Sequence, residues 1–209
     1  KDKSVDDLFA AGYEAIFVGN GADVPQPPRG LDTSLTGVWS ANDYLTQVNL
    51  HNDTLPANIK DAKRVLVVGG GNVSMDATRT ALRLGAESVT CVYRRRVEDM
   101  TALAEEIEEA MAEGCQILPL QAPARIEADE NGCVTALWTR PQHIGPYGND
   151  GRPKPVAADA PEFRIPCDYV IVAIGQGIES QGFEQAGIKI QRGGTLLADS
   201  STRLPEMEG

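Results

Sequence analysis

The sequence contains few of the side chains that build metal centres and acid/base sites. Its 209 residues include four cysteines and two histidines, and only 5% of them are aromatic. The cysteines lie 24, 18 and 34 residues apart, so no Cys-x-x-Cys pair occurs. Structural zinc sites and dithiol relays both depend on closely spaced ligands. We therefore expect no metal site, and with so few groups able to move protons we assign no catalytic residue.

Positive charge and long apolar runs are scarce as well. Lysine and arginine together number 19 against 30 aspartates and glutamates, which gives a net charge of −11. Such a chain repels the phosphates of nucleic acids and anionic lipid headgroups. Its apolar runs are shorter than the roughly 20 residues that a membrane-spanning helix needs. We expect neither nucleic acid nor a membrane as a partner, and a cytoplasmic location.

Alternating apolar strands and helices predict an α/β fold. Residues 64–68 form a β-branched run typical of a strand buried on both faces of a parallel sheet. A helical spacing of apolar residues follows, and residues 88–93 return as a strand. Further on we predict a helix at 103–111, strands at 115–120 and 168–175, and an antiparallel hairpin of residues 124–128 and 134–139. The expected architecture is a Rossmann-like three-layer domain in which an antiparallel meander covers one face of the sheet.

Elements outside this core are predicted from shorter signals. They are a helix at 4–11 capped by Ser4, a strand at 13–18, a helix at 40–50, connectors at 23–37 and 52–61, a surface loop at 141–161 and a hairpin within 188–198. The prediction of a loop at 141–161 rests on composition, because five of the thirteen prolines fall within it.

A glycine-rich turn joins the first core strand to the helix that follows. It consists of Gly69, Gly70, Gly71, Asn72, Val73 and Ser74. This run fits the G-x-G-x-x-G/A dinucleotide fingerprint with serine as the third small residue. In that motif the first glycine permits the tight turn, the second lets a pyrophosphate approach the backbone, and the third small residue lets helix and strand pack closely. The alternative is a glycine-rich turn that binds nothing.

Three arginines follow the second strand, at the position that distinguishes NAD sites from NADP sites. NAD sites usually carry Asp or Glu there for the ribose hydroxyls, whereas arginine suits the 2′-phosphate of NADP. Here the strand runs into Arg94, Arg95 and Arg96, the first of them 25 residues after Gly69. A guanidinium group can bind a phosphate bidentately. We therefore predict NADP(H) as the cofactor, and the alternative is a solvated run of charge.

Two further features give weaker signals. Asp76 lies in the first turns of the expected helix, where a carboxylate suits the helix dipole but repels a pyrophosphate. A cofactor contact and a structural hydrogen bond are both open for Asp76. Ala173, Ile174 and Gly175 end the last core strand, and the glycine would let the backbone lie close to a flat ligand. We expect the nicotinamide to pass near this turn.

As a set, these motifs resemble the NADPH-binding domain of glutamate synthase small (beta) subunits and related FAD-dependent pyridine nucleotide oxidoreductases. The resemblance is carried by residues 67–76, 79–81, 85–86, 92–95, 104–107 and 170–176, and it spans nearly the whole chain. It implies an NADP domain inserted in an FAD domain, of which the chain holds only a part. Residues 1–37 would then be the edge of the FAD domain and a connector, residues 38–180 the NAD(P)H-binding domain, and residues 181–209 the return segment.

The same resemblance implies the activity of a flavin-dependent oxidoreductase. Hydride would pass from NADPH to FAD, and electrons would continue to iron–sulfur centres. FAD and the iron–sulfur clusters would lie in other parts of a longer protein, so these 209 residues alone would be inactive. The implied partner is a large glutamate synthase-type subunit or another electron acceptor such as ferredoxin. The alternative is a non-catalytic dinucleotide-binding sensor or assembly module, which a colourless full-length protein would favour.

Overall fold

The computed structural model describes residues 3–205 apart from 27, 29, 52–58, 60 and 150. The chain forms two compact units, one of residues 27–174 and one of residues 1–26 together with 175–209. The connector predicted at 52–61 lies almost entirely outside the described residues. Within the described ranges, no helix is long and apolar enough to span a membrane. The three-part division at residues 37 and 180 stays a prediction.

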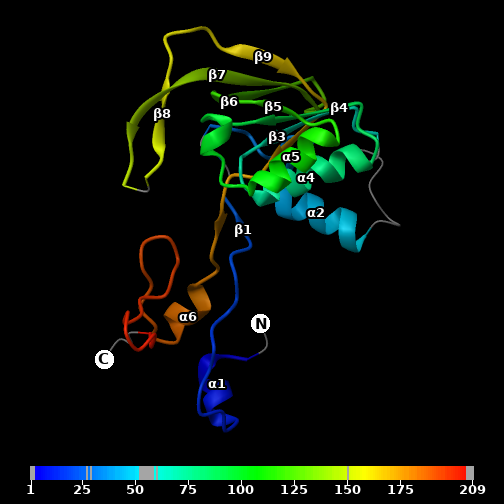
Figure 1. Ribbon diagram of the computed structural model, residues 1–209. Coiled ribbons are helices and arrows are strands. Elements are labelled where there is room, and N and C mark those ends of the chain that lie inside the picture. The colour runs from blue at the N-terminus through cyan, green and yellow to red at the C-terminus, as the bar shows by residue number, and fades with distance from the viewer. Residues whose placement is uncertain are drawn as a thin grey trace. The chain divides into compact units, whose positions relative to one another are not determined.

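A five-stranded parallel sheet forms the centre of the larger unit (Figure 1). In spatial order its strands are β2 (Val38–Ser40), β10 (Tyr169–Val172), β3 (Arg64–Val68), β4 (Ser88–Val92) and β5 (Gln116–Leu118). Every neighbouring pair is parallel. All of β10 and all but the first residue of β3 are buried, which explains why both are continuous apolar runs without alternation. The predicted α/β class with a parallel sheet is confirmed.

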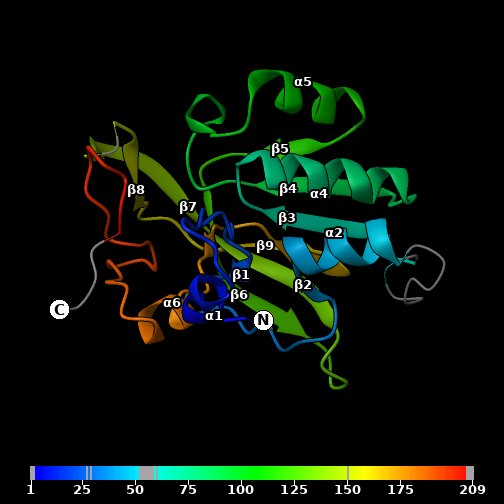
Figure 2. The same cartoon turned by 90° about the horizontal axis from the view of Figure 1, so that it is seen from below.

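Three helices cover one face of this sheet. They are α2 (Ala41–Leu50), α4 (Asn72–Arg83) and α5 (Ala104–Ala112), with α4 lying between the other two (Figure 2). Ala77 and Ala81 of α4 pack against the sheet in one core cluster with Val67 and Ile171. Small alanine side chains at these positions let the helix axis approach the strands closely.

An antiparallel meander covers the opposite face of the sheet, as predicted (Figure 1). It comprises β6 (Gln121–Ala128), β7 (Val134–Tyr147), β8 (Pro153–Ala157) and β9 (Phe163–Pro166). Leu137 is fully buried in a cluster with Leu66 and Val170 of the parallel sheet. The apolar face of the meander therefore supplies the second half of the core.

The surface loop predicted at 141–161 is wrong. Strand β7 continues to Tyr147 and β8 pairs with it, so the segment is largely a β-hairpin. The prolines misled the composition argument because β8 pairs only with β7 and is an edge strand. Proline is tolerated on such an edge, where a missing N–H costs no inter-strand hydrogen bond.

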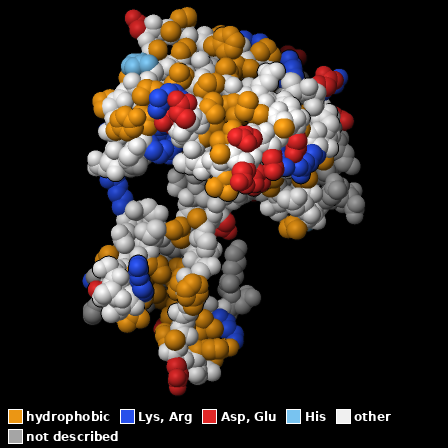
Figure 3. All heavy atoms as spheres, in the orientation of Figure 1, with side chains coloured by type: hydrophobic (Ala, Val, Ile, Leu, Met, Phe, Trp, Pro, Cys, Tyr) orange, Lys and Arg blue, Asp and Glu red, His pale blue; other side chains and the backbone are white. Residues whose placement is uncertain are grey.

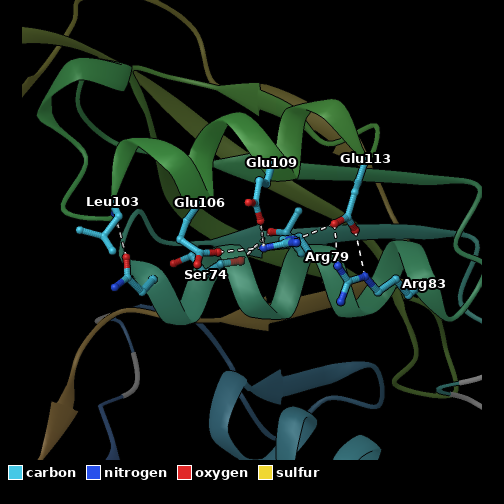
Figure 4. A network of polar contacts seen from close by, with 9 residues as sticks. Ser74, Arg79, Arg83, Leu103, Glu106, Glu109 and Glu113 are labelled. Carbon is cyan, nitrogen blue, oxygen red and sulfur yellow. Dashed lines mark hydrogen bonds and ion pairs between the residues drawn. The ribbon is translucent and has the colours of Figure 1, made fainter.

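An ion-pair network joins α4 to α5 (Figure 4). The guanidinium of Arg79 lies 2.9 Å from Glu106, 2.7 Å from Glu109 and 2.8 Å from Glu113, and Arg83 shares Glu113 at 2.7 Å. Charged side chains of both signs accordingly gather over these two helices (Figure 3). Because α5 is rich in glutamate, these pairs offset the repulsion among its carboxylates and hold it beside α4.

The smaller unit contains little regular structure. Its elements are α1 (Val5–Ala10), β1 (Val24–Pro25), β11 (Gln176–Gly177) and α6 (Gln181–Gln185), and β1 pairs antiparallel with β11. Helix α1 is capped by Ser4, as predicted. The strand predicted at 13–18 is wrong, because none of the described residues pairs with it and Phe17 is 94% exposed. An apolar run becomes a strand only where a neighbouring strand accepts its hydrogen bonds. The predicted hairpin within 188–198 is confirmed as a short one: Ile190 and Leu196 form an antiparallel bridge, the Gln191 N–H donates to the Thr195 carbonyl at 2.7 Å, and the Leu197 N–H donates to the Lys189 carbonyl at 2.8 Å.

The partly exposed carboxylate of Glu127 links three strands of the meander. Glu127 of β6 accepts hydrogen bonds from Arg164 of β9 at 2.7 Å and from Trp138 of β7 at 2.8 Å. The Arg164 guanidinium, followed by the Trp138 indole, lowers the pKa of Glu127 from its usual 4.5 to about 2. The meander is therefore stabilised by this carboxylate only while it is ionised.

This cluster predicts a loss of stability in acid. The pKa of Glu127 is lower in the folded state, so its contribution is complete above pH 4.5 and disappears as the pH falls to about 2. We expect the Glu127→Gln variant to lose stability at neutral pH and to show a shallower fall of the urea midpoint between these pH values. Glu130→Gln is the matched control, since Glu130 is exposed in the turn after β6. Identical acid profiles for Glu127→Gln and the parent would contradict this role.

Candidate dinucleotide-binding site

The glycine-rich turn lies at the carboxyl end of β3 and leads directly into α4. From β3 the chain proceeds to β4 and β5 on one side, whereas β10 pairs on the other side of β3. The turn is therefore at the point where the order of the strands reverses. In open parallel sheets this crevice at the carboxyl ends of the strands is where ligands bind. Ala173, which follows β10, lies beside the turn and donates its N–H to the carbonyl of Val68 at 2.8 Å.

Gly69 is enclosed so closely that no other residue fits. Its φ is 155°, and a Cβ added there would lie 2.5 Å from the carbonyl oxygen of Ala173 and would also collide with the Oγ of Ser74. The N–H of Gly69 donates to the carbonyl of Val92 at 3.1 Å. The first fingerprint glycine thus lets β3 pass into α4 while the turn stays hydrogen-bonded to β4.

The ring of Tyr93 packs so closely on Gly70 that it leaves no room for a side chain there. A Cβ on Gly70 would lie 2.5 Å from the Cδ2 atom of Tyr93. The carbonyl of Gly70 accepts the N–H groups of Thr101 at 2.9 Å and Ala102 at 3.1 Å. The segment that precedes α5 therefore closes over the carbonyl side of the turn and fixes its shape.

The amide side of the turn is different. Among the residues that the structure describes, no acceptor is found for the N–H groups of Gly70, Asn72 and Val73. The N–H of Gly71 donates to the Oγ of Ser74 at 3.3 Å. Unsatisfied amides at a helix start carry partial positive charge and bind anions such as a pyrophosphate. The backbone can therefore donate several hydrogen bonds to one phosphate group.

The side chains of the turn serve the fold. Ser74 is fully buried, which fits the close packing expected of the third small residue. The Oδ1 of Asn72 accepts the N–H of Leu103 at 2.9 Å and so links the start of α4 to the start of α5 (Figure 4). Asp76 is exposed. Neither alternative for Asp76, a cofactor contact or a structural hydrogen bond, is decided by its described contacts.

The three arginines after β4 have three different environments. Arg94 is exposed and forms no ion pair with a carboxylate of the described residues. Arg95 is 8% exposed, and its Nε donates to the carbonyl of Pro153 at 2.7 Å. Arg96 pairs with Asp99 at 2.8 Å. Of the three, only Arg94 has a guanidinium with no hydrogen bond or ion pair to a described residue, so it can bind a ligand without giving up such a contact.

A fourth arginine lies at this place, and the sequence patterns did not indicate it. Arg152, between β7 and β8, donates to the hydroxyl of Tyr93 at 2.6 Å and to the carbonyl of Asp99 at 2.9 Å. Desolvation and then the positive charges of Arg95 and Arg152 lower the pKa of Arg94. The smaller contribution from Arg95 and Arg152 shows that positive charge lies close to Arg94, and a bound phosphate would offset it.

Comparison with known proteins identifies the family. A family model described as pyridine nucleotide-disulphide oxidoreductase matches residues 1–208. The chain belongs to this family. The resemblance drawn from the sequence motifs is thereby confirmed, because the curated relatives of this family member include glutamate synthase small chains.

These oxidoreductase relatives are longer than this chain. The NADP(+)-dependent formate dehydrogenase subunit beta of Moorella thermoacetica is 34% identical over 97% of this chain and 28% of its own length. The glutamate synthase [NADPH] small chain of Azospirillum brasilense is 32% identical over 94% of this chain and 42% of its own length. The chain thus spans less than half the length of these two proteins.

Solved structures of oxidoreductases share the fold at low sequence identity. Mycobacterium tuberculosis FprA in complex with NADPH has a TM-score of 0.63 at 16% identity, covering 82% of this chain and 51% of that one. The thioredoxin reductase of T. acidophilum has a TM-score of 0.52 at 19% identity, covering 68% of this chain and 40% of that one. At this identity the likeness concerns the fold alone, and it confirms the Rossmann-like class.

The structure brings most of the predicted site residues of this family member together. The glycine turn lies beside Ala173, and Tyr93, which directly precedes the arginine run, packs on Gly70. Ile174 is the last residue of the larger unit, and Gly175, with a φ of 66°, is the first of the other unit. The position of a nicotinamide near Ile174 and Gly175 stays a prediction, as does phosphate binding by the arginines.

The contact of Gly70 with Tyr93 generates a testable prediction. The Tyr93 hydroxyl is held by Asp99 and Arg152, so its ring cannot move aside to admit a Cβ. We expect Gly70→Ala to lower the free energy of unfolding by about 1–3 kcal/mol. Gly71→Ala should change it by less than about 0.5 kcal/mol, because the nearest atom to a Cβ there is Thr101 Oγ1 at 3.4 Å. Urea unfolding measures both values, and equal losses in the two variants would refute the steric role of Tyr93.

Proposed function

We propose that residues 38–180 are the NADPH-binding domain of a flavin-dependent oxidoreductase similar to the glutamate synthase small subunit. One observation carries the proposal: amides at the start of α4 that find no acceptor in the described part of the chain occur in the same unit as an arginine cluster at the end of β4. Both lie at the carboxyl ends of neighbouring strands. A dinucleotide with a 2′-phosphate has one anionic group for each, the pyrophosphate and the 2′-phosphate.

The residues present fit this cofactor. Gly70, Asn72 and Val73 would donate backbone hydrogen bonds to the pyrophosphate. A Cβ on Gly71 would meet no described atom nearer than 3.4 Å, so the space beside Gly71 is open for a phosphate. Arg94 would bind the 2′-phosphate, with the positive charges of Arg95 and Arg152 nearby. When bound, NADPH supplies a hydride for transfer to the flavin, and the protein contributes binding and orientation.

The wider electron path belongs to the same proposal. Hydride passes from NADPH to FAD and electrons continue to iron–sulfur centres, with FAD and the clusters held outside these 209 residues. In support of NADPH as the electron donor, one relative is named NADPH-Fe(3+) oxidoreductase subunit beta, from Geobacter sulfurreducens, and is 33% identical over 94% of this chain. The proposed partner is a large glutamate synthase-type subunit or another acceptor such as ferredoxin. The division into residues 1–37, 38–180 and 181–209 is part of the proposal.

The first test places the pyrophosphate at the glycine turn. A Cβ at Gly71 is tolerated by the protein but would occupy the space proposed for the ligand. We expect Gly71→Ala to fold normally and to bind NADPH at least about tenfold more weakly, a cost of about 1.4 kcal/mol. Calorimetric titration of NADPH into the whole natural protein measures this effect. Unchanged affinity in a normally folded variant would rule out pyrophosphate binding at this turn.

The second test concerns the 2′-phosphate. Loss of one charge-assisted hydrogen bond costs about 1.5–3 kcal/mol, or about 10–100-fold in affinity. We expect Arg94→Gln to weaken NADPH binding by this factor and to leave NADH binding nearly unchanged. The rate of flavin reduction by each nucleotide in the whole protein gives the same comparison. Arg140→Gln is the matched control, because Arg140 is exposed on β7 and pairs with Glu162. An equal effect of Arg94→Gln on NADPH and NADH would contradict the assignment.

A further inference from the structure

The hairpin of β7 and β8 carries Arg152 next to its tip. The N–H of Gly148 donates to the carbonyl of Arg152 at 2.7 Å, and the N–H of Gly151 donates to the carbonyl of Gly148 at 3.1 Å. Pro153, the first residue of β8, is fully buried. The backbone on both sides of the Arg152 side chain is therefore fixed by local contacts.

This hairpin is fastened to the segment that follows β4. Arg152 donates to the Tyr93 hydroxyl at 2.6 Å and to the Asp99 carbonyl at 2.9 Å. The Tyr93 hydroxyl in turn donates to the same Asp99 carbonyl at 2.7 Å. From the other direction, Arg95 donates to the carbonyl of Pro153 at 2.7 Å. The contacts close a ring that fixes residues 93, 95 and 99, and Arg94 lies within the segment so held.

The charges in this ring are unequal. Among the described residues, four arginines, numbers 94, 95, 96 and 152, lie with two carboxylates, Glu98 and Asp99, and both carboxylates pair with Arg96. Arg94 has no carboxylate partner among the described residues, so its charge is available to an anion.

We propose that Arg152 is a positioning residue that sets the preference for a 2′-phosphorylated dinucleotide by clamping the segment that carries Arg94. The inference rests on the proposed function. Its basis is that one terminal nitrogen of a guanidinium carries two N–H groups and can donate to two acceptors at once, as Nη2 of Arg152 does. The hydroxyl of Tyr93 and the carbonyl of Asp99 are those acceptors, and they bracket Arg94 in the sequence. The β7–β8 hairpin, which is not part of the strand–turn–helix motif, then contributes to the preference for a 2′-phosphorylated dinucleotide.

The test measures the ratio of the dissociation constants for NAD+ and NADP+ in the whole natural protein. We expect Arg152→Gln to lower this preference for NADP+ about tenfold, with little change in NAD+ binding. Tyr93→Phe should lower it too, because it removes one of the two acceptors while keeping the ring that packs on Gly70. Since both variants break the same clamp, the double variant should lose no more than Arg152→Gln alone. Arg140→Gln serves again as the arginine control.

Arg152→Lys separates clamping from charge. Lysine keeps the positive charge, but its nitrogen lies one bond nearer the backbone than Nη2 of arginine, so we expect it to restore the preference only in part. Full restoration by lysine together with a silent Tyr93→Phe variant would overturn the positioning role. Equal weakening of NADP+ and NAD+ by Arg152→Gln would overturn it as well, since general damage affects both nucleotides. If the parent protein itself shows no preference for NADP+, the proposed function fails. A parent with the preference and an unaffected Arg152→Gln variant would refute only this inference.

Discussion

The close approach of three chain segments at the end of β3 is the constraint on which the rest of the site depends. Gly69 faces the carbonyl of Ala173, and Gly70 faces the ring of Tyr93, in both cases with no room for a Cβ. Because the turn is so tight, α4 begins immediately after the strand and its first amides lie at the edge of the sheet. The same tightness brings β10, β3 and β4 to one place, where residues from each can act on one ligand.

Positive charge is concentrated next to this turn. The chain as a whole is acidic, with a net charge of −11, and most of its arginines are engaged by carboxylates. Between α4 and α5 these ion pairs are numerous, since Arg79 alone pairs with three glutamates. At the end of β4 the pattern changes, because Arg95 donates to a neutral backbone carbonyl and Arg94 is exposed without a carboxylate partner among the described residues. An acidic protein can thus present a local positive site for a phosphate without losing its net charge.

The family assignment concerns nearly the whole chain, whereas the geometry concerns the fold and one turn of the larger unit. Membership of the pyridine nucleotide-disulphide oxidoreductases rests on a match to residues 1–208, whereas the structural neighbours establish the fold. The chain covers 28–42% of the length of the two relatives described above. The larger unit holds the proposed dinucleotide site, and the flavin chemistry is proposed to reside in the remainder of the protein.

Local patterns in the sequence determined the strands at 64–68 and 88–93, the helix between them and the glycine turn, because these depend on neighbours a few residues apart. The apolar run at 13–18 and the proline-rich segment at 141–161 were misjudged, since the presence or absence of a pairing strand decides whether such a segment is a strand. Tyr93 and Arg152 lie 59 residues apart, and no spacing rule connects them. The sequence by itself therefore determined the family, the parallel sheet and the glycine-rich turn. Only the tertiary structure decided which arginine is exposed and what holds it, because burial and hydrogen bonding between separate strands arise when the meander packs on the sheet.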